Sequence, residues 1–191
     1  KLSLNALMAT GALHQALIKQ RKRTKVNSIV STGSARDTHQ IACLIAFGAT
    51  SVYPWLAYQT ILDLSHKTEL KGDPFENCAK YRKGINKGLL KIISMLGISL
   101  ISSYRGSQLF EIVGLSNECV DKCFTNTDSR IGGKNFRNLE NENRNISLFA
   151  KSNISDVSVG GLLKFIHGGE YHSYNPDAVS YTHLTLPTRF S

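Results

Sequence analysis

The sequence predicts an α/β protein built from parallel βα units. Short runs of apolar and β-branched residues alternate with longer segments in which apolar residues recur every three to four positions. The clearest example is the stretch 81–114, in which a helix, a strand and a second helix follow one another directly. Because strands and helices that alternate at this spacing are typical of a parallel sheet with crossover helices, we expect that architecture here.

The expected elements follow from this alternation. Apolar residues at helical spacing predict helices at 2–18, 37–47, 56–64, 74–96, 109–113 and 118–124. Short apolar or β-branched runs predict strands at 26–30, 49–55 and 98–101. Punctuating residues set several bounds: Gly97 and Gly114 end helices, Pro54 stops the second strand, and Pro74 opens a helix.

The helix expected at 74–96 has an apolar face and an opposite basic face. The apolar residues are Ile85, Leu89, Ile92, Ile93 and Leu96. Lys83, Lys87 and Lys91 fall four residues apart on the other side. Since a half-apolar helix normally turns its charges to water, we interpret the lysine stripe as a solvated face. An anion-binding or docking surface is the alternative interpretation.

The second half of the chain is more polar. Residues 125–159 are rich in Asn, Ser, Asp and Lys, and we expect a linker there with one helix around 136–149. A second domain is expected to begin at residue 160. Residues 175–177 (Asn-Pro-Asp) combine an N-cap, a proline at the first helical position and an acidic residue in the first turn, and this combination predicts a helix. Residues 179–191 resemble one reading frame of a transposase-type sequencing adapter. We therefore expect a translated artefact there and accidental chain ends.

The composition is that of an ordinary globular domain with a basic charge. The chain has 191 residues, of which 41% are hydrophobic and 19% charged, and a formal net charge of +9. Part of this charge is local, in the run 19–25 between a helix and a strand, where cations favour the helix dipole. No signature of an RNA-binding module, zinc finger or helix-turn-helix accompanies it, so a nucleic-acid partner is not favoured. No apolar run has the length of a membrane span and no signal peptide is visible, which favours a cytoplasmic protein without a membrane partner.

The sequence offers no convincing metal site. The cysteines, which form no CxxC pair, are Cys43, Cys78, Cys119 and Cys123. Cys119 and Cys123 are one helical turn apart, but no nearby histidine or third cysteine completes a site, so we expect free thiols. His167, Glu170 and His172 are of metal-ligand types, yet two glycines interrupt them and they do not share a helix face.

Other candidate groups also have plain structural interpretations. The loop 31–36 lies between a strand and a helix N-terminus, where backbone N–H groups hold phosphates in many proteins. It lacks the GxGxxG and P-loop spacings, so a plain βα loop is favoured. His14 and His39 lie among apolar neighbours, as core or interface histidines do. No catalytic, cofactor-binding or metal-binding residue is therefore assigned.

Several long motifs in order resemble the large (α) subunit of glutamate synthase. The matching stretches are 7–14 (LMATGALH), 34–39 (SARDTH), 47–54 (FGATSVYP), 56–58 (LAY), 81–114, 123–124 (CF), 129–132 (SRIG) and 160–177. They cover about residues 2–178, and ordered long motifs are far more specific than any lone short pattern. The amino-acid sequences of 47–54 and 160–177 are similar to those of bacterial NADPH-dependent forms.

The resemblance implies a parent enzyme that converts glutamine, 2-oxoglutarate and reductant into two molecules of glutamate. It implies FMN and an iron–sulfur cluster in the parent, with FAD and NADPH reached through a small subunit. Residues 1–124 would be the C-terminal part of an incomplete, barrel-like central domain. Residues 125–159 would be a linker, 160–178 the start of the FMN-dependent synthase domain, and 179–191 the artefact.

The resemblance implies no catalytic residue within this sequence. The family's catalytic cysteine lies upstream of Lys1, and its FMN-, 2-oxoglutarate- and cluster-binding residues lie downstream of the matched stretch. We therefore expect a structural and interdomain segment of a cytoplasmic enzyme of ammonia assimilation, inactive and without cofactor by itself. Its partners would be the rest of the large subunit and a small NADPH-oxidising subunit. The alternative is a stand-alone basic α/β module that binds nucleic acid.

Overall fold

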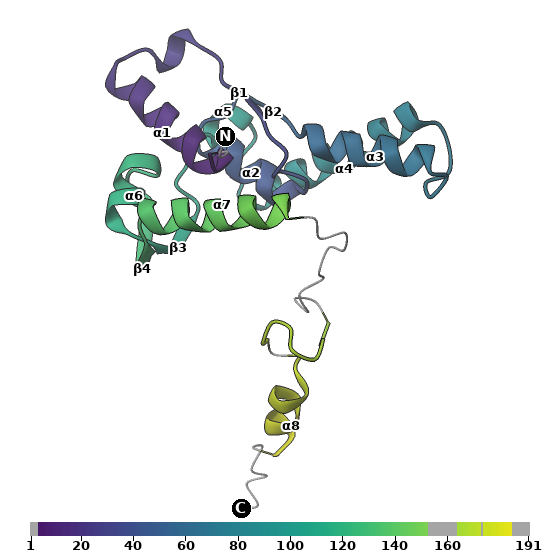
Figure 1. Cartoon of the computed structure of the whole chain (residues 1–191). Coiled ribbons are helices and arrows are strands. Elements are labelled where there is room, and N and C mark those ends of the chain that lie inside the picture. Colours follow the sequence, from purple (N-terminus) through teal and green to yellow (C-terminus); the bar gives the residue numbers. More distant parts are fainter. Residues whose placement is uncertain (1–3, 153–163, 173, 185–191) are drawn as a thin grey trace, which may run out of the picture. The chain divides into compact units, whose positions relative to one another are not determined.

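The computed structural model describes residues 4–152, 164–172 and 174–184. The chain divides into two compact units, Lys1–Asn145 and Ile146–Ser191, and each is described by itself. The helices (Figure 1) are α1 (Ala6–Lys19), the 3-10 turn η1 (Arg23–Lys25), α2 (Thr38–Ala46), α3 (Trp55–His66), α4 (Pro74–Met95), α5 (Ile101–Tyr104), α6 (Asn117–Cys123), α7 (Phe136–Lys151) and α8 (Pro176–Leu184). The strands are β1 (Ile29–Ser31), β2 (Ser51–Tyr53), β3 (Glu111–Leu115) and β4 (Asp128–Lys134).

The described strands form two small parallel sheets. β1 pairs with β2, with Ile29 opposite Ser51. β3 pairs with β4, with Glu111 opposite Asp128. Helices make up most of the regular structure, so the protein is a mixed α/β structure in which helices predominate. The expected α/β class with parallel strands is confirmed at this level.

Helix α2 forms the centre of the first unit. Its buried residues are Ile41, Ala42, Leu44, Ile45 and Ala46. Helices α1 and α4 and the sheet β1–β2 pack around it, and α3 packs against α4 as a helical hairpin (Figure 1). Burial of one Leu or Ile side chain contributes about 1.5–3 kcal/mol, so α2 carries much of the hydrophobic stabilisation of this unit.

Pro74 and Gly97 mark the ends of α4 as expected, and the structure adds side-chain caps to α2 and α4. The Asp37 carboxylate accepts the N–H of Gln40 at 2.8 Å, and the Gln40 side chain accepts the N–H of Asp37, which completes a capping box at α2. Asp73 caps α4, with Pro74 at the first helical position. Gly97 follows α4 with a φ of 69°, the left-handed conformation that favours glycine. None of the described helices has both the length and the apolar character that a membrane crossing requires.

The strand expected at 98–101 is wrong. Residues 98–100 belong to no strand of the described chain, and α5 begins at Ile101. A run of four apolar residues does not distinguish a buried strand from the start of a helix. Here the wholly buried ring of Tyr104 anchors the helical turn in the core. Residues 102–104, which the sequence places in a polar loop, are therefore helical.

The helix expected at 109–113 is also wrong, because residues 111–113 belong to β3 and residues 109–110 to no helix or strand. The β-branched Val113 suits a strand and lies opposite Ile131 of β4. Gly114, expected to close the helix, lies inside the strand with a φ of 82°, at a point where the register shifts. A Cβ on Gly133 would meet the backbone of Gly114, so both glycines allow the strands to approach closely.

The polar second half contains regular structure. Strand β4 and helix α7 both lie within 125–159, and the helix expected around 136–149 is confirmed. In the second unit, α8 begins at Pro176 as expected. The new start expected at residue 160 lies outside the described residues, as do residues 185–191 of the expected artefact. The domain boundaries stay predictions.

Candidate functional site

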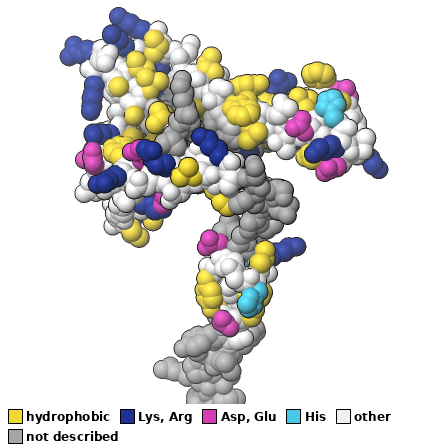
Figure 2. All heavy atoms as spheres, in the orientation of Figure 1, with side chains coloured by type: hydrophobic (Ala, Val, Ile, Leu, Met, Phe, Trp, Pro, Cys, Tyr) yellow, Lys and Arg dark blue, Asp and Glu magenta, His cyan; other side chains and the backbone are white. Residues whose placement is uncertain are grey.

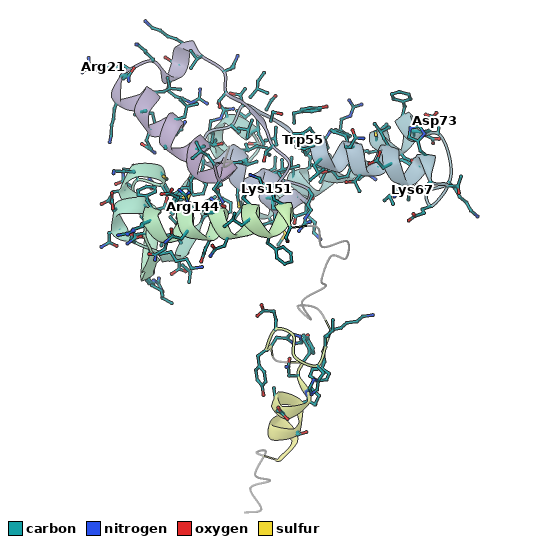
Figure 3. The ribbon with its side chains drawn as sticks, in the orientation of Figure 1. Arg21, Trp55, Lys67, Asp73, Arg144 and Lys151 are labelled. Carbon is teal, nitrogen blue, oxygen red and sulfur yellow. The ribbon has the colours of Figure 1, made fainter. Side chains whose placement is uncertain are left out.

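An open groove of about 770 Å³ lies beside β1. It is lined by α1, by β1 and the loop that follows it, and by Trp55 at the start of α3, which is labelled in Figure 3. A Cβ on Gly33 would stand 3.0 Å from the Trp55 ring, so a glycine allows the loop to follow the indole closely. Because ligands of α/β folds usually bind at loops that follow strands, this groove is the first candidate site.

Backbone N–H groups around the loop 31–36, which would have to donate to a bound phosphate, already donate to side chains of the protein. The N–H of Arg36 donates to Gln40 Oε1 at 2.8 Å. The N–H of Gln40, in the first turn of α2, donates to Asp37 Oδ1. The Asp37 carboxylate also places a negative charge where a phosphate would bind. This geometry favours the plain βα loop, and it does not fit the phosphate of a nucleotide or flavin cofactor.

A second candidate is a group of three side chains at the end of α2, His14, Arg23 and Arg105, which we call the arginine cluster. Arg23 Nε donates to His14 Nδ1 at 2.8 Å, and Arg23 Nη2 donates to the carbonyl of Gly48 at 2.8 Å. A Cβ on Gly48 would stand 2.6 Å from the His14 ring, and its φ is 123°, so this position requires glycine. The network connects α1, η1 and the end of α2.

The environment of the arginine cluster keeps His14 neutral. Burial lowers the pKa of His14, and the positive charges of Arg23 and Arg105 lower it further. Since Nδ1 accepts a hydrogen bond from Arg23, the ring proton lies on Nε2. Burial, and after it the charge of Arg105, also lowers the pKa of Arg23. Arg105 therefore lies within electrostatic reach of both side chains.

The basic turn after α1 adjoins this cluster. Lys and Arg side chains gather over the turn in Figure 2, and Figure 3 labels Arg21 there. The sequence reveals the turn by its charges, but it does not reveal Arg105. Arg105 follows α5, and the hydrogen bond from the N–H of Gly106 to the carbonyl of Ala46, at 2.7 Å, brings it to α2. Only the folded chain shows this neighbourhood.

Cys43 and His39 lie one turn apart on α2, with 3.6 Å between Sγ and Nε2. A thiol beside an imidazole is the usual arrangement of a cysteine nucleophile. Here burial, and after it the charge of Asp37, raises the pKa of the Cys43 thiol, so the reactive thiolate is disfavoured. The His39 ring packs near Phe110, with 6.3 Å between ring centroids. The described geometry therefore does not favour a cysteine nucleophile here.

The described residues do not fit a metal centre. Across 4–152, 164–172 and 174–184, no three His, Cys, Asp or Glu side chains come together in a way that would hold a metal ion. The cysteines are distributed over α2 (Cys43), α4 (Cys78) and α6 (Cys119 and Cys123). An iron–sulfur cluster requires converging thiolates, so these cysteines do not fit one. His167 and Glu170 are exposed, and His172 Nδ1 accepts the N–H of Tyr174 at 3.1 Å.

The stretches that carry the sequence motifs contact one another. Gly11 of α1 faces the backbone carbonyl of Cys123 at the end of α6, so closely that a Cβ would collide with it. The hydroxyl of Tyr81 on α4 donates to the carbonyl of Arg36 at 2.9 Å. These contacts join α1 to α6 and α4 to the loop before α2. The motif residues named here therefore make contacts between elements.

The described chain is therefore a mixed α/β protein in which the motif residues named above make contacts between elements. The family model of the glutamate synthase central domain matches residues 1–116. The chain belongs to this family, as its motifs predict.

Similar proteins include glutamate synthases with three electron donors. The chain is 42% identical to the ferredoxin-dependent glutamate synthase of Cyanidium caldarium over 94% of its length. It is 37% identical to the glutamate synthase [NADPH] large chain of Bacillus subtilis over 91%, and 33% identical to the glutamate synthase [NADH] of Saccharomyces cerevisiae over 98%. It spans 12%, 12% and 9% of the lengths of these relatives, respectively.

Proposed function

We propose that the chain is part of the large subunit of a glutamate synthase and serves there as a structural and interdomain segment of the central domain. The parent would convert glutamine, 2-oxoglutarate and reductant into two molecules of glutamate, in glutamate biosynthesis and ammonia assimilation. One observation carries this role: motif residues pack against one another, as Gly11 does on Cys123 and Tyr81 on Arg36.

The segment contributes packing to the parent and no reacting group. The thiol of Cys43 has a raised pKa, and backbone N–H groups around the loop 31–36 are already bonded. We assign no catalytic, cofactor-binding or metal-binding residue to this chain. We place FMN and the iron–sulfur cluster that the family implies elsewhere in the parent, with FAD and NADPH on the small subunit. For the cluster, the lack of converging metal ligands among the described residues supports this.

The finer organisation is part of the same proposal. Residues 1–124 are the C-terminal part of the central domain, with βα units that belong to a barrel-like arrangement larger than this chain. Residues 125–159 link to the FMN-dependent synthase domain, which starts at 160–178, and 179–191 are a translated adapter. The partners are the rest of the large subunit and the small NADPH-oxidising subunit, in the cytoplasm.

The electron donor that we propose is NADPH. This proposal is supported by the amino-acid sequences of the stretches 47–54 and 160–177, which are similar to those of NADPH-dependent forms. The similar proteins include ferredoxin- and NADH-dependent enzymes at comparable identity, so the donor is best tested directly on the parent. Glutamate formation with each of the three reductants would identify it.

A flavin-retention experiment tests the structural role. The 191-residue chain would be purified after incubation with FMN, beside the Bacillus subtilis large chain treated in the same way. We expect no flavin absorbance and no glutamate formation from the chain alone. Stoichiometric flavin on it would contradict the proposal.

The basic turn after α1 supports a second candidate, a nucleic-acid-binding module. Binding through such a turn would weaken steeply as salt rises, because phosphate contacts release counterions. A gel-shift titration at physiological ionic strength tests it, with a Lys19→Gln, Lys22→Gln, Lys25→Gln variant as the control. A salt-dependent shift that this variant loses would favour the module; our proposal expects no shift.

A further inference from the structure

The guanidinium of Arg105 is partly buried and lacks a hydrogen-bond or ion-pair partner in the part of the chain that the structure describes. Its Nε atom is fully enclosed and unbonded. A guanidinium has five N–H donors and always carries its charge. Because a buried donor without a protein acceptor raises the free energy of the fold, an acceptor from outside the described residues would stabilise this side chain.

The end of α2, which Arg105 adjoins, does not supply that acceptor. Carbonyls of its last turn already accept backbone N–H groups at 2.7–3.1 Å: Cys43 from Phe47, Leu44 from Ala49, Ile45 from Gly48, and Ala46 from Gly106. The carbonyl of Gly48 accepts Arg23 Nη2. Capping of α2, the simplest structural role for Arg105, is therefore performed by other groups.

A second cation, Arg23, lies within electrostatic reach of Arg105, and the two guanidinium groups repel each other. The ion pairs among the described residues involve other side chains: Lys80–Glu76, Lys122–Glu118, Arg130–Glu111, Lys134–Glu142 and Arg144–Glu140. Two partly buried cations without a counter-charge are unfavourable unless an anion joins them.

We propose that Arg105 and Arg23 form a binding site for a carboxylate group. Each guanidinium nitrogen of Arg23 is already bonded, Nε to His14, Nη1 to the carbonyl of Val26 and Nη2 to that of Gly48, so Arg23 contributes charge. Arg105 contributes the free paired N–H groups, whose geometry matches the two oxygens of a carboxylate.

The carboxylate has two possible sources. One is an acidic side chain of the parent large subunit, since the chain spans only 9–12% of the relatives described above. The other is a free carboxylate ion. The inference rests on the proposed function in this respect, and the experiment therefore uses the full-length large subunit that carries this segment.

The experiment compares Arg105→Gln with Arg137→Gln, which removes the same charge from an exposed position on α7. Thermal unfolding is recorded in sodium chloride and in sodium acetate at equal ionic strength. We expect Arg105→Gln to lower the Tm relative to Arg137→Gln. Without a bound carboxylate, removal of an unpaired guanidinium beside Arg23 leaves the Tm unchanged or raises it, and either result would overturn the inference.

The acetate series identifies the source. A Tm that acetate raises in the wild type but not in Arg105→Gln indicates a free ion. A Tm lowered by Arg105→Gln and insensitive to acetate indicates an acidic side chain of the subunit. Should Arg105→Gln not fold, Arg105→Lys, which loses the paired donors, is compared with Arg137→Lys, and a Tm no lower than that control overturns the inference. Glutamate formation by the wild-type preparation tests the parent assignment separately.

Discussion

Single side chains around α2 are held by hydrogen bonds and close packing. His14 accepts the Nε–H of Arg23 and lies against Gly48, where no Cβ fits. Cys43, the residue that most resembles a nucleophile, has its thiol pKa raised by burial. At this scale the chemistry of the residues serves the packing of elements.

The protonation of His14 should make the protein less stable at low pH. Its folded-state pKa is lowered, while a histidine in the unfolded chain titrates at about 6.5, so the unfolded state binds more protons once the pH falls below about 7. Stability is then lost as the pH falls from about 7 towards the lowered pKa. In His14→Asn the amide oxygen accepts the Arg23 N–H without titrating, so the loss should be smaller. Urea unfolding at about pH 7.5 and pH 5.5 measures it.

The control is His66→Asn, at the exposed end of α3. This variant should keep the wild-type dependence on pH. An equal loss of stability in His14→Asn and in the wild type would contradict the role given to His14.

Among the elements, helix α2 depends most on its ends. The capping box of Asp37 and Gln40 satisfies N–H groups that the first helical turn leaves free. The helix carries the buried residues around which α1, α4 and the sheet β1–β2 pack. A weaker cap on α2 therefore weakens the whole first unit.

Asp37→Ala should lower the free energy of unfolding by about 1 kcal/mol, within a range of about 0.5–2, because the cap is lost. Asp121→Ala, at an exposed position on α6, should change it by less than about 0.5 kcal/mol. Urea unfolding followed by circular dichroism measures both. Equal effects of the two substitutions would show that the cap does not stabilise α2.

Two glycines of α4 provide a matched pair. A Cβ on Gly88 would stand 2.5 Å from Thr38 Oγ1 on α2, whereas nothing lies within 4 Å of one on Gly84. Gly84→Ala should stabilise the helix by about 0.5–1 kcal/mol through helix propensity alone. Gly88→Ala should destabilise the protein by about 1–3 kcal/mol, because α2 and α4 must separate. The midpoints of thermal unfolding compare them, and a stabilising Gly88→Ala would contradict the close packing of α2 on α4.

Local signals predicted the elements with strong periodicity or caps and missed those that depend on distant partners. The helices near residues 37–47 and 74–96 are confirmed, since Asp37 and Pro74 encode their starts within a few residues. The expected strand at 98–101 was wrong because a strand needs a neighbour, and the chain there turns into α5. The segment 109–113 was expected to be helical because its pairing partner, β4, lies further along the chain.

At the scale of the whole molecule, the exposed apolar surface is prominent. Ile29 of β1 is 73% exposed, Val113 of β3 65% and Ile131 of β4 60%. Parallel sheets are normally covered on both faces, and these two have only two strands each. The pattern agrees with the proposal that the segment packs within a larger subunit.

The isolated chain should bind the hydrophobic dye ANS (1-anilinonaphthalene-8-sulfonate) and increase its fluorescence several-fold. An Ile29→Thr, Val113→Thr double variant keeps β-branched residues in the strands but removes apolar surface, so its signal should be lower. Fluorescence titration at equal protein concentrations measures the difference. A wild-type chain that leaves the dye unchanged would show that these strands are covered.

The sequence by itself determined the family, the parallel α/β class and the helices whose caps and apolar periods are local, because those signals lie within a few residues of one another. The candidate site was only partly accessible to sequence reasoning. The basic turn was visible as a run of charges, and the loop 31–36 as a position between elements. Only the tertiary structure decided that Arg105 lies within electrostatic reach of Arg23 and His14 and that residues 111–115 form a strand. The physical reason is that charge repulsion and strand pairing depend on distances between residues far apart in the chain, which packing around α2 sets and local spacing does not encode.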